Sequence, residues 1–269
     1  MDKNISVIIT LYKTPINNLQ LLKQYENYNL IIFDQDTKSN KKTISAILKK
    51  KFRYFYSKKN IGLSKATNFL ISKVKTKFFL FTQADIEIDN VSIVNLLNII
   101  KSKKDVIFAA PVIGEYFKKK LTRKYIYSNK LNAVIMLCDL KKVKKLGFFD
   151  ENFFLYWEDI DLMKRINRSK YKMVIANNIY ANHYSGQSSG NSSKTKYIRK
   201  QNFMFGELVY DYKYKKFRFI KIIRKIVQNF VLFFFNLIRF QLQDSLNNFS
   251  KLCGVIKFIL YYCKKKARL

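Results

Sequence analysis

Short apolar runs alternate with amphipathic segments along the N-terminal part of the chain. Runs such as ISVIITLY (5–12) and KFFLFT (77–82) are rich in β-branched and aromatic residues, and polar or acidic residues follow them. Such runs indicate strands that are buried on both faces, as in a parallel sheet. Strands are predicted at 5–12, 29–36, 52–59 and 77–89, and helices at 16–28, 41–51, 60–75 and 91–104. This alternation predicts an α/β domain with a mostly parallel sheet flanked by helices.

The pattern changes from about Lys213, where basic and aromatic residues surround a long apolar stretch. Its centre is too short and too interrupted for a transmembrane helix. Wound at about 100° per residue, the segment gathers polar residues on one stripe: Arg218, Lys221, Lys225, Asn229, Asn236, Arg239 and Gln243. A wide aromatic face opposite a basic stripe is typical of a helix in a membrane interface, and packing against the rest of the chain or a partner is the alternative. We therefore expect the α/β domain at 1–212 and an amphipathic helical tail at 213–269.

The charge of the chain is strongly positive, with 52 Lys and Arg against 18 Asp and Glu and a formal net charge of +34. It predicts attraction to nucleic acid, anionic lipid or phosphorylated substrates, with a solvated lysine surface as the plain alternative. Because no RNP, KH, helix-turn-helix or zinc pattern accompanies the charge, nucleic-acid binding is the least favoured of these. The basic C-terminus, CKKKARL, suits anionic lipid.

The cysteines and the N-terminus bear on the compartment. Three cysteines without a CxxC spacing suit a reducing environment and argue against a disulfide framework. The N-terminal apolar run is too short for a signal peptide. Together these observations predict a cytoplasmic protein.

Acidic side chains follow two of the predicted strands. Asp34 and Asp36 end one strand, and Asp85 and Glu87 follow another. Ligands of open α/β sheets bind beyond the carboxyl ends of the strands, so these acids are candidates for a binding site, with turn or helix-capping roles as the alternative. Asp85 can hold a divalent metal ion, which takes hard oxygen ligands. The single histidine, His183, stands beside a loop rich in Gly and Ser, which favours contact with a ligand.

The segment GFFDENFFLYWEDIDLMKR (147–165) concentrates acids beside bulky apolar residues. It holds Asp150, Glu151, Glu158, Asp159 and Asp161. Carboxylates in such surroundings are unfavourable unless they bind cations or take up a proton. One interpretation is a helix start, where acids interact well with the backbone dipole and Asp161 can pair with Arg165 at i,i+4. The other is a general base that removes a proton from a substrate hydroxyl.

The order of these motifs, over about residues 4–205, resembles glycosyltransferase family 2 of the GT-A fold, and especially its rhamnosyltransferase-like branch. The segment at 147–165 carries the strongest resemblance, to GxFDExFFxYxEDxDLxxR. SVIITLYKT resembles the family's opening strand, with Lys13 in place of the usual Asn, and IIFDQDTKS resembles its nucleotide-contacting segment. KNIGLSKATNFLI resembles NxGxAxAxNxGI, and HYSGQSS resembles a late His-x-x-Gly-x-Ser loop. FTQADIEI stands where the family has a DxD motif, with Gln83 in place of the first acid.

This resemblance implies an inverting transfer of a sugar from a nucleotide-sugar donor. The residues that would contact the donor are Thr10, Tyr12, Asp34, Asn60, Gly62, Asn68, Gln83 and Asp85. Asp85 and His183 would hold Mg²⁺ or Mn²⁺ against the diphosphate, where the ion offsets charge on the leaving group. Asp159 would be the catalytic base, with Glu158 as the alternative.

The resemblance also implies roles for the neighbours of the base and for the tail. Asp161 and Arg165 would orient the helix, while Trp157 and its neighbour Tyr156 would stack on the acceptor sugar or fill the core. The acceptor would be a hydroxyl of a glycan carried on polyprenyl diphosphate, in surface-polysaccharide biosynthesis. The tail would hold the protein on the anionic inner face of the plasma membrane, or join two copies as a homodimer. A catalytically degenerate member that acts as a membrane or assembly scaffold is the alternative left open by Gln83 and Lys13.

Overall fold

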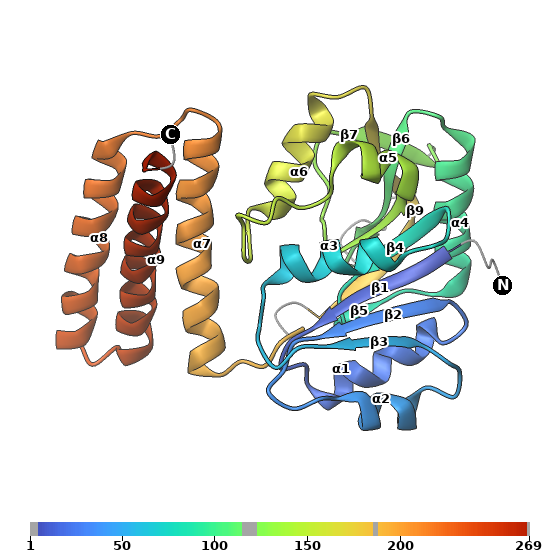
Figure 1. Ribbon diagram of the computed structural model, residues 1–269, viewed down its shortest axis with the longest axis horizontal. Coiled ribbons are helices and arrows are strands. Elements are labelled where there is room, and N and C mark those ends of the chain that lie inside the picture. The colour runs from blue at the N-terminus through green and yellow to red at the C-terminus, as the bar shows by residue number, and fades with distance from the viewer. Residues whose placement is uncertain (1–4, 115–122, 185–187, 268–269) are drawn as a thin grey trace. The chain divides into compact units, whose positions relative to one another are not determined.

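The computed structural model describes residues 5–114, 123–184 and 188–267, and two compact units are distinguished in the chain (Figure 1). An α/β unit comprises Met1–Phe149 and Leu162–Gly190, and a helical unit comprises Asp150–Asp161 and Asn191–Leu269. The boundary between the units falls inside helix α6 (Glu158–Asn167). Each unit has its own apolar core and is described by itself.

A mixed sheet forms the frame of the α/β unit. Its strands are β1 (Ile5–Leu11), β2 (Asn29–Asp34), β3 (Arg53–Tyr56), β4 (Phe78–Thr82), β5 (Ile86–Glu87), β6 (Val106–Ile113), β7 (Tyr125–Ser128), β8 (Ile135–Asp139) and β9 (Lys172–His183). Within the described residues their order is β3-β2-β1-β4-β8-β6-β9-β5, and β7 also pairs with β9. Strands β3, β2, β1 and β4 are parallel, as are β6 and β9, whereas β8 runs antiparallel between β4 and β6. The predicted α/β class is confirmed, and so is the parallel pairing of the first four strands.

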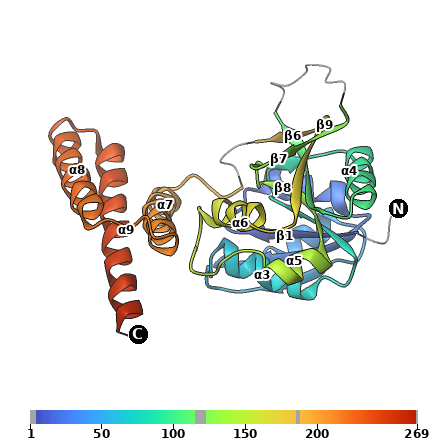
Figure 2. The ribbon, with the colours of Figure 1, turned by 90° about the horizontal axis from the view of Figure 1, so that it is seen from above.

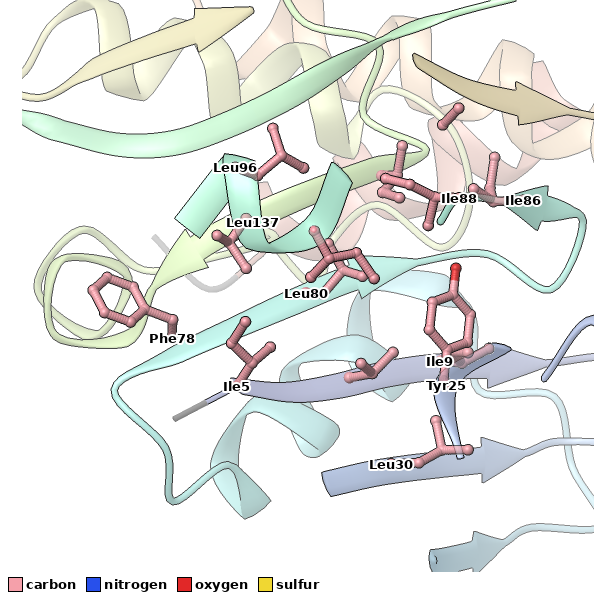
Figure 3. Close-up of a cluster of buried hydrophobic side chains, with 14 of the residues drawn as sticks. Ile5, Ile9, Tyr25, Leu30, Phe78, Leu80, Ile86, Ile88, Leu96 and Leu137 are labelled. Carbon is pink, nitrogen blue, oxygen red and sulfur yellow. The ribbon is translucent and has the colours of Figure 1, made fainter. Parts of the chain in front are cut away.

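Helices cover both faces of this sheet, because alternate residues of each central strand point to opposite sides. They are α1 (Ile16–Gln20), the 3-10 helix η1 (Leu21–Tyr25), α2 (Lys41–Ile47), α3 (Leu63–Lys73), α4 (Asn90–Ser102) and α5 (Leu140–Leu146). In β1, Ile5 and Ile9 belong to a core shared with Tyr25 of η1 and Leu96 of α4 (Figure 3). Ile8 belongs to the second core, which includes residues of α3, α5 and α6.

The parallel strands bring three loops to one edge of the sheet. Leu11 at the end of β1 lies opposite Asp34 at the end of β2, and Ile9 lies opposite Thr82 at the end of β4. The segments that follow these strands therefore leave the sheet in the same direction. This edge is where the sequence predicted the binding site.

Three long helices make up most of the helical unit (Figure 2). They are α7 (Ser193–Lys213), α8 (Phe219–Ile238) and α9 (Leu242–Lys266), and α9 packs against both of the others. Gly254 lets α9 approach α7 closely, because an added Cβ would lie 2.4 Å from the carbonyl oxygen of Gln201. Residues contributing to the core are Phe153, Met204, Phe205, Leu208, Val209, Ile222, Val255 and Phe258.

Two predictions concern these helices. By its contacts α7 groups with α8 and α9, whereas the boundary predicted from the sequence lies after residue 212. That boundary was placed where the residue pattern changes at about Lys213, and it stays a prediction. In the part of the chain that the structure covers, each helix is too short or too polar to span a bilayer.

Candidate active site

Asp85 and His183 come together at the edge of the sheet in the α/β unit. Asp85 lies in the turn between β4 and β5, and the pairing of Ile86 with His183 brings the end of β9 alongside. The carboxylate Oδ2 of Asp85 accepts a hydrogen bond from the backbone amide of Ser188 at 2.8 Å and lies 3.5 Å from Nε2 of His183. Asp85 is fully buried, and its other oxygen, Oδ1, finds no hydrogen-bond partner among the described residues.

These two side chains fit a divalent metal ion. A buried carboxylate oxygen without a hydrogen-bond partner is energetically unfavourable, and a bound cation stabilises it. The described residues contain no group of three or more His, Cys, Asp and Glu side chains that could hold a metal. Mg²⁺ needs no such group, because it keeps waters and takes oxygens from substrate phosphates. Gln83 lies two residues before Asp85 and is half-buried, so its neutral amide occupies the position where an acid was expected.

Asp34 forms a second polar centre in the same unit. It is fully buried at the end of β2, where Oδ2 accepts hydrogen bonds from the backbone and side-chain amides of Asn40 at 2.8 and 3.1 Å, and from the hydroxyl of Tyr54. Burial and the hydrogen bond to Asp34 raise the pKa of Tyr54 well above its usual range. Oδ1 of Asp34 is buried and lacks a partner within the residues described. One oxygen thus holds the side chain in place, and the other remains able to accept from a ligand.

In the segment from Asn60 to Asn68, the side chains of both asparagines form hydrogen bonds with backbone groups. Gly62 has a φ of 90°, which side chains rarely adopt, and its amide donates to Oδ1 of Asn60 at 2.9 Å. The side-chain amide of Asn68 donates to the backbone oxygen of Phe149 at 2.9 Å and accepts from its nitrogen at 3.2 Å. Asn68 therefore holds Phe149, near the start of the acidic segment at 147–165, and its predicted contact with the donor stays a prediction.

Thr10 and Tyr12 lie at the end of β1 and just beyond it, and both are partly exposed. Lys13, which follows, has a φ of 48° in the left-handed region. Asn is enriched several-fold in that region, which gives a backbone reason for the Asn that the family usually has there. The carbonyl of Lys13 accepts from the amide of Gly190 at 2.8 Å. This contact anchors the end of the predicted HYSGQSS loop, of which residues 185–187 lie outside the described residues.

In the helical unit, two strained residues precede the acidic motif. Tyr156 and Trp157 have φ values of 68° and 71°, and α6 begins immediately afterwards at Glu158. Non-glycine residues in such regions each cost on the order of 1–3 kcal/mol and cluster at functional sites. Gly206 of α7 makes room for them, because a Cβ there would lie 2.9 Å from Cδ1 of Trp157 and 3.0 Å from the carbonyl oxygen of Tyr156.

The indole of Trp157 packs within the helical unit. Its ring centroid lies 5.3 Å from that of Tyr210 and 5.8 Å from that of Phe203, and the side chain is half-buried. These contacts favour the core-filling interpretation over stacking on a sugar. They do not test the acceptor role, which stays a prediction.

Glu158 and Asp159 differ in their surroundings. Glu158 is buried, and its Oε2 has no hydrogen-bond partner within the described part of the chain. Burial and the neighbouring charge of Asp159 raise the pKa of Glu158 to about 8. Asp159 is less buried and accepts a hydrogen bond from the amide of Ile160 at 2.8 Å, and burial raises its pKa as well. Of the two carboxyl groups, Glu158 therefore holds a proton more readily near neutral pH.

Asp161 and Arg165 make structural contacts within their own units. The buried carboxylate of Asp161 lies 2.6 Å from Nζ of Lys213 and accepts from the hydroxyl of Tyr214 at 2.9 Å. The guanidinium of Arg165 donates to the carbonyl oxygens of Leu146, Gly147 and Phe148, which follow from the end of α5. Both contacts suit the predicted supporting role, and that role stays a prediction.

The residues of this geometry that were not among the predicted site residues include Asn40, Tyr54 and Gly206. Gly206 carried a weak signal, because a glycine inside a helical pattern destabilises the helix by about 1 kcal/mol relative to Ala. Tyr54 reaches Asp34 from the neighbouring strand β3, where Asp34 pairs with Tyr56. That register depends on the folded sheet, and nothing local in the sequence indicates it.

Comparison with known structures shows the same fold in several glycosyltransferases. The chain is similar to GalNAc-T7 crystallised with UDP, GalNAc and Mn²⁺ (14% identity, TM-score 0.54, 76% of this chain and 48% of that one). It is also similar to the mannosyltransferase PcManGT of Pyrobaculum calidifontis in complex with GDP-Man and Mn²⁺ (11%, 0.55, 77% and 64%). TarS of S. aureus is a third (12%, 0.52, 75% and 39%). These likenesses confirm the predicted GT-A fold.

The chain spans less than two thirds of the length of each of these proteins. No curated protein matches the sequence. The sequence model of one family, described as glycosyl transferase family 2, matches residues 6–162. The match does not reach the level of a branch, so the rhamnosyltransferase-like assignment stays a prediction. Because the matched region covers more than half of the chain, the protein belongs to glycosyl transferase family 2.

Proposed function

We propose that this family-2 protein transfers a sugar, with inversion, from a nucleotide-sugar donor to a hydroxyl of a lipid-linked glycan in surface-polysaccharide biosynthesis. The observation that carries the transfer chemistry is the carboxylate of Asp85. It is buried at the end of β4, 3.5 Å from the imidazole of His183, with one oxygen lacking a partner among the described side chains and backbone. A nucleotide diphosphate with its metal ion supplies what this carboxylate lacks.

In this proposal Asp34 and Asp85 contact different parts of the donor. The free oxygen of Asp34 is suited to accept a hydrogen bond from the base or the ribose, because its other oxygen is already held by Asn40 and Tyr54. Asp85 and His183 would hold Mg²⁺ or Mn²⁺, and the ion would offset negative charge on the departing diphosphate. The GalNAc-T7 structure contains UDP and Mn²⁺, and the PcManGT structure contains GDP-Man and Mn²⁺, which supports this assignment.

Asp159 is the base in this proposal. A general base must be ionised at the working pH. Burial and the charge of Asp159 raise the pKa of Glu158 to about 8, so Glu158 keeps its proton near neutrality. Asp159 then carries the charge of the pair and takes the proton of the acceptor hydroxyl as the new glycosidic bond forms. Glu158 remains the alternative base, and the pair resembles other carboxyl pairs in which environment separates the two roles.

Features of the helical unit support the proposed acceptor and location. Its helices expose many apolar side chains, and the chain carries a net charge of +34. Both features suit a protein that works on the anionic inner face of a membrane, where a glycan on polyprenyl diphosphate would be presented. A homodimer through the same helices is the competing arrangement.

A nucleotide-release assay tests the proposal. Purified protein is incubated with a panel of UDP-, dTDP- and GDP-sugars, with and without Mn²⁺, beside an Asp159→Asn variant and an Asp85→Asn variant. Release that Mn²⁺ stimulates and both variants lose would support transfer and identify the donor. If calorimetry also detects no binding of any nucleotide, the enzyme assignment fails and the scaffold alternative, which Gln83 favours, replaces it.

A further inference from the structure

Helix α8 turns polar residues inward, onto the other helices of its unit. The ammonium of Lys221 lies 2.7 Å from a carboxylate oxygen of Glu207 and also pairs with Asp211, both on α7. The ammonium of Lys225 lies 2.8 Å from Glu207. Asn229, on the same stripe, is buried and donates to the carbonyl of Lys225 at 2.7 Å. The stripe that the sequence analysis predicted is therefore partly occupied in holding α8 to α7.

The opposite side of α8 is a broad apolar face. Its exposed members, with exposed fractions of 36–77%, are Phe219, Ile220, Ile223, Ile226, Val227, Phe230, Val231, Phe234, Phe235, Leu237 and Ile238. A water-soluble surface helix has the reverse arrangement, with its apolar stripe against the core. Continuous apolar patches of this kind mark sites where a protein meets a partner or a membrane.

The charged residues around this apolar face indicate what kind of partner covers it. The sequence has no Asp or Glu between Asp211 and Asp244, so the face has no acidic residue on its own helix. Uncharged residues run from Ile226 to Ile238 between Lys225 and Arg239. Arg218, Arg224 and Arg239 are exposed, and so are the three lysines at the end of α9, Lys264, Lys265 and Lys266. Two copies would bring these cations together, whereas anionic lipid headgroups complement them.

We infer that the apolar face of α8 is inserted into the acyl-chain boundary of an anionic membrane, with the helix lying along the surface. Its 20 residues make a rod of about 30 Å. In a free interfacial helix the polar stripe faces water, but here α7 and α9 take the place of water on that side. Arg218 and Arg239, which flank the helix at its two ends, meet the headgroups. Only the purpose of this membrane contact, which is to bring the enzyme to a lipid-linked acceptor, rests on the proposed function.

Three substitutions on the face test the inference. Val227→Glu, Phe230→Glu and Phe234→Glu together remove apolar area and add charge at exposed positions. We expect binding of the full chain to phosphatidylglycerol vesicles, measured by flotation, to weaken about tenfold or more. The matched control carries Val91→Glu, Val94→Glu and Ile126→Glu, which change the charge equally at exposed apolar positions of the α/β unit. It should float as the native chain does.

A second variant keeps the test valid if the triple substitution disturbs folding. Phe234→Trp preserves an aromatic side chain on the face. Its fluorescence should shift to shorter wavelength on vesicle binding and should be quenched by lipids brominated on their acyl chains. Emission that stays unchanged while the protein floats would overturn the inference, because binding would then be electrostatic alone.

The alternatives are separated by the same samples. A triple variant that floats as well as the native chain would overturn the inference. A stable dimer of the native chain, detected by sedimentation without lipid, would also overturn the inference if the triple variant abolished the dimer but still bound vesicles. Nucleotide-sugar binding by calorimetry is measured in parallel. If the native protein binds no nucleotide yet requires the α8 face for vesicles, the proposed function fails while the membrane surface stands.

Discussion

The two units of this protein hold their acids in opposite ways. In the α/β unit, Asp34 and Asp85 sit at strand ends, and each has one carboxylate oxygen held by hydrogen bonds from neighbouring loops. In the helical unit, Glu158 and Asp159 follow two left-handed residues, and burial raises the pKa of both. The first arrangement keeps a charge in a fixed position, as binding a cation or a hydrogen-bond donor requires. The second favours taking up a proton.

The sharpest test of this contrast is Asp159→Asn. If Asp159 is the base, removing its ability to accept a proton should lower kcat by about 10²–10⁴-fold, with little change in nucleotide-sugar binding measured by calorimetry. Asp244→Asn, at an exposed acid of α9, is the matched control and should leave kcat unchanged. Native kcat in Asp159→Asn, together with its loss in Glu158→Gln, would assign the base to Glu158 instead.

On the α/β side, Asp85→Asn should weaken binding of Mn²⁺ with nucleotide by about tenfold to a hundredfold, because a metal site that loses its charged ligand loses most of its attraction for the ion. Calorimetric titration of nucleotide with and without Mn²⁺ measures this. Glu87→Gln is the control, since Glu87 is exposed two residues away and accepts from the hydroxyl of Tyr184 at 2.7 Å. Equal losses in the two variants would mean that general electrostatics, and no specific ligand, explain the effect.

Gly206→Ala tests the strain in the helical unit. The added Cβ would approach Trp157 and Tyr156 to within 3.0 Å, and a packed indole and a backbone carbonyl yield little. We expect a loss of about 1–2 kcal/mol in the free energy of unfolding, even though Ala favours a helix by about 1 kcal/mol over Gly.

Urea denaturation measures this loss, and Lys200→Ala at an exposed position of α7 is the control, with a change within about 0.5 kcal/mol. A stabilised Gly206→Ala protein would show that the Tyr156–Trp157 segment moves aside freely. In that case the strained conformation would not be what positions the acids.

The pH dependence of the free energy of unfolding should show whether Glu158 is the group whose pKa is raised in the folded protein. Its pKa is about 8 in the folded protein against an ordinary value of 4.5, so the folded state binds more protons between these values. The contribution of protonated Glu158 to the free energy of unfolding is fully present below pH 4.5 and is lost as pH rises through 8. The slope is at most about 1.4 kcal/mol per pH unit. Urea denaturation of the native protein and of Glu158→Gln from pH 5 to 9 should show that the variant lacks this part of the slope. Parallel pH profiles would place the proton elsewhere.

The same comparison shows what the sequence can and cannot predict. Strands β1, β2 and β4 and helices α3 and α4 follow from local apolar patterns, and with them the positions of Asp34 and Asp85. The antiparallel insertion of β8 between β4 and β6 depends on pairing between distant segments, which no local pattern specifies. In α8, the period of the sequence tells which residues share a stripe. It does not tell which stripe faces the other helices, because that is decided by Glu207 and Asp211 on α7.

The smallest expected effect concerns Lys13, in the α/β unit. This residue has a φ of 48°, where Asn is tolerated better than other side chains because it can hydrogen-bond locally. Lys13→Asn should therefore raise the free energy of unfolding by about 0.5 kcal/mol, while Lys13→Val, with a β-branched side chain, should lower it. The carbonyl of Lys13 keeps its bond to Gly190 in both variants, so the difference between them isolates the backbone preference. If Asn and Val proved equally stable by urea denaturation, the left-handed conformation would carry no strain, and the family's usual Asn would need an explanation in ligand contact instead.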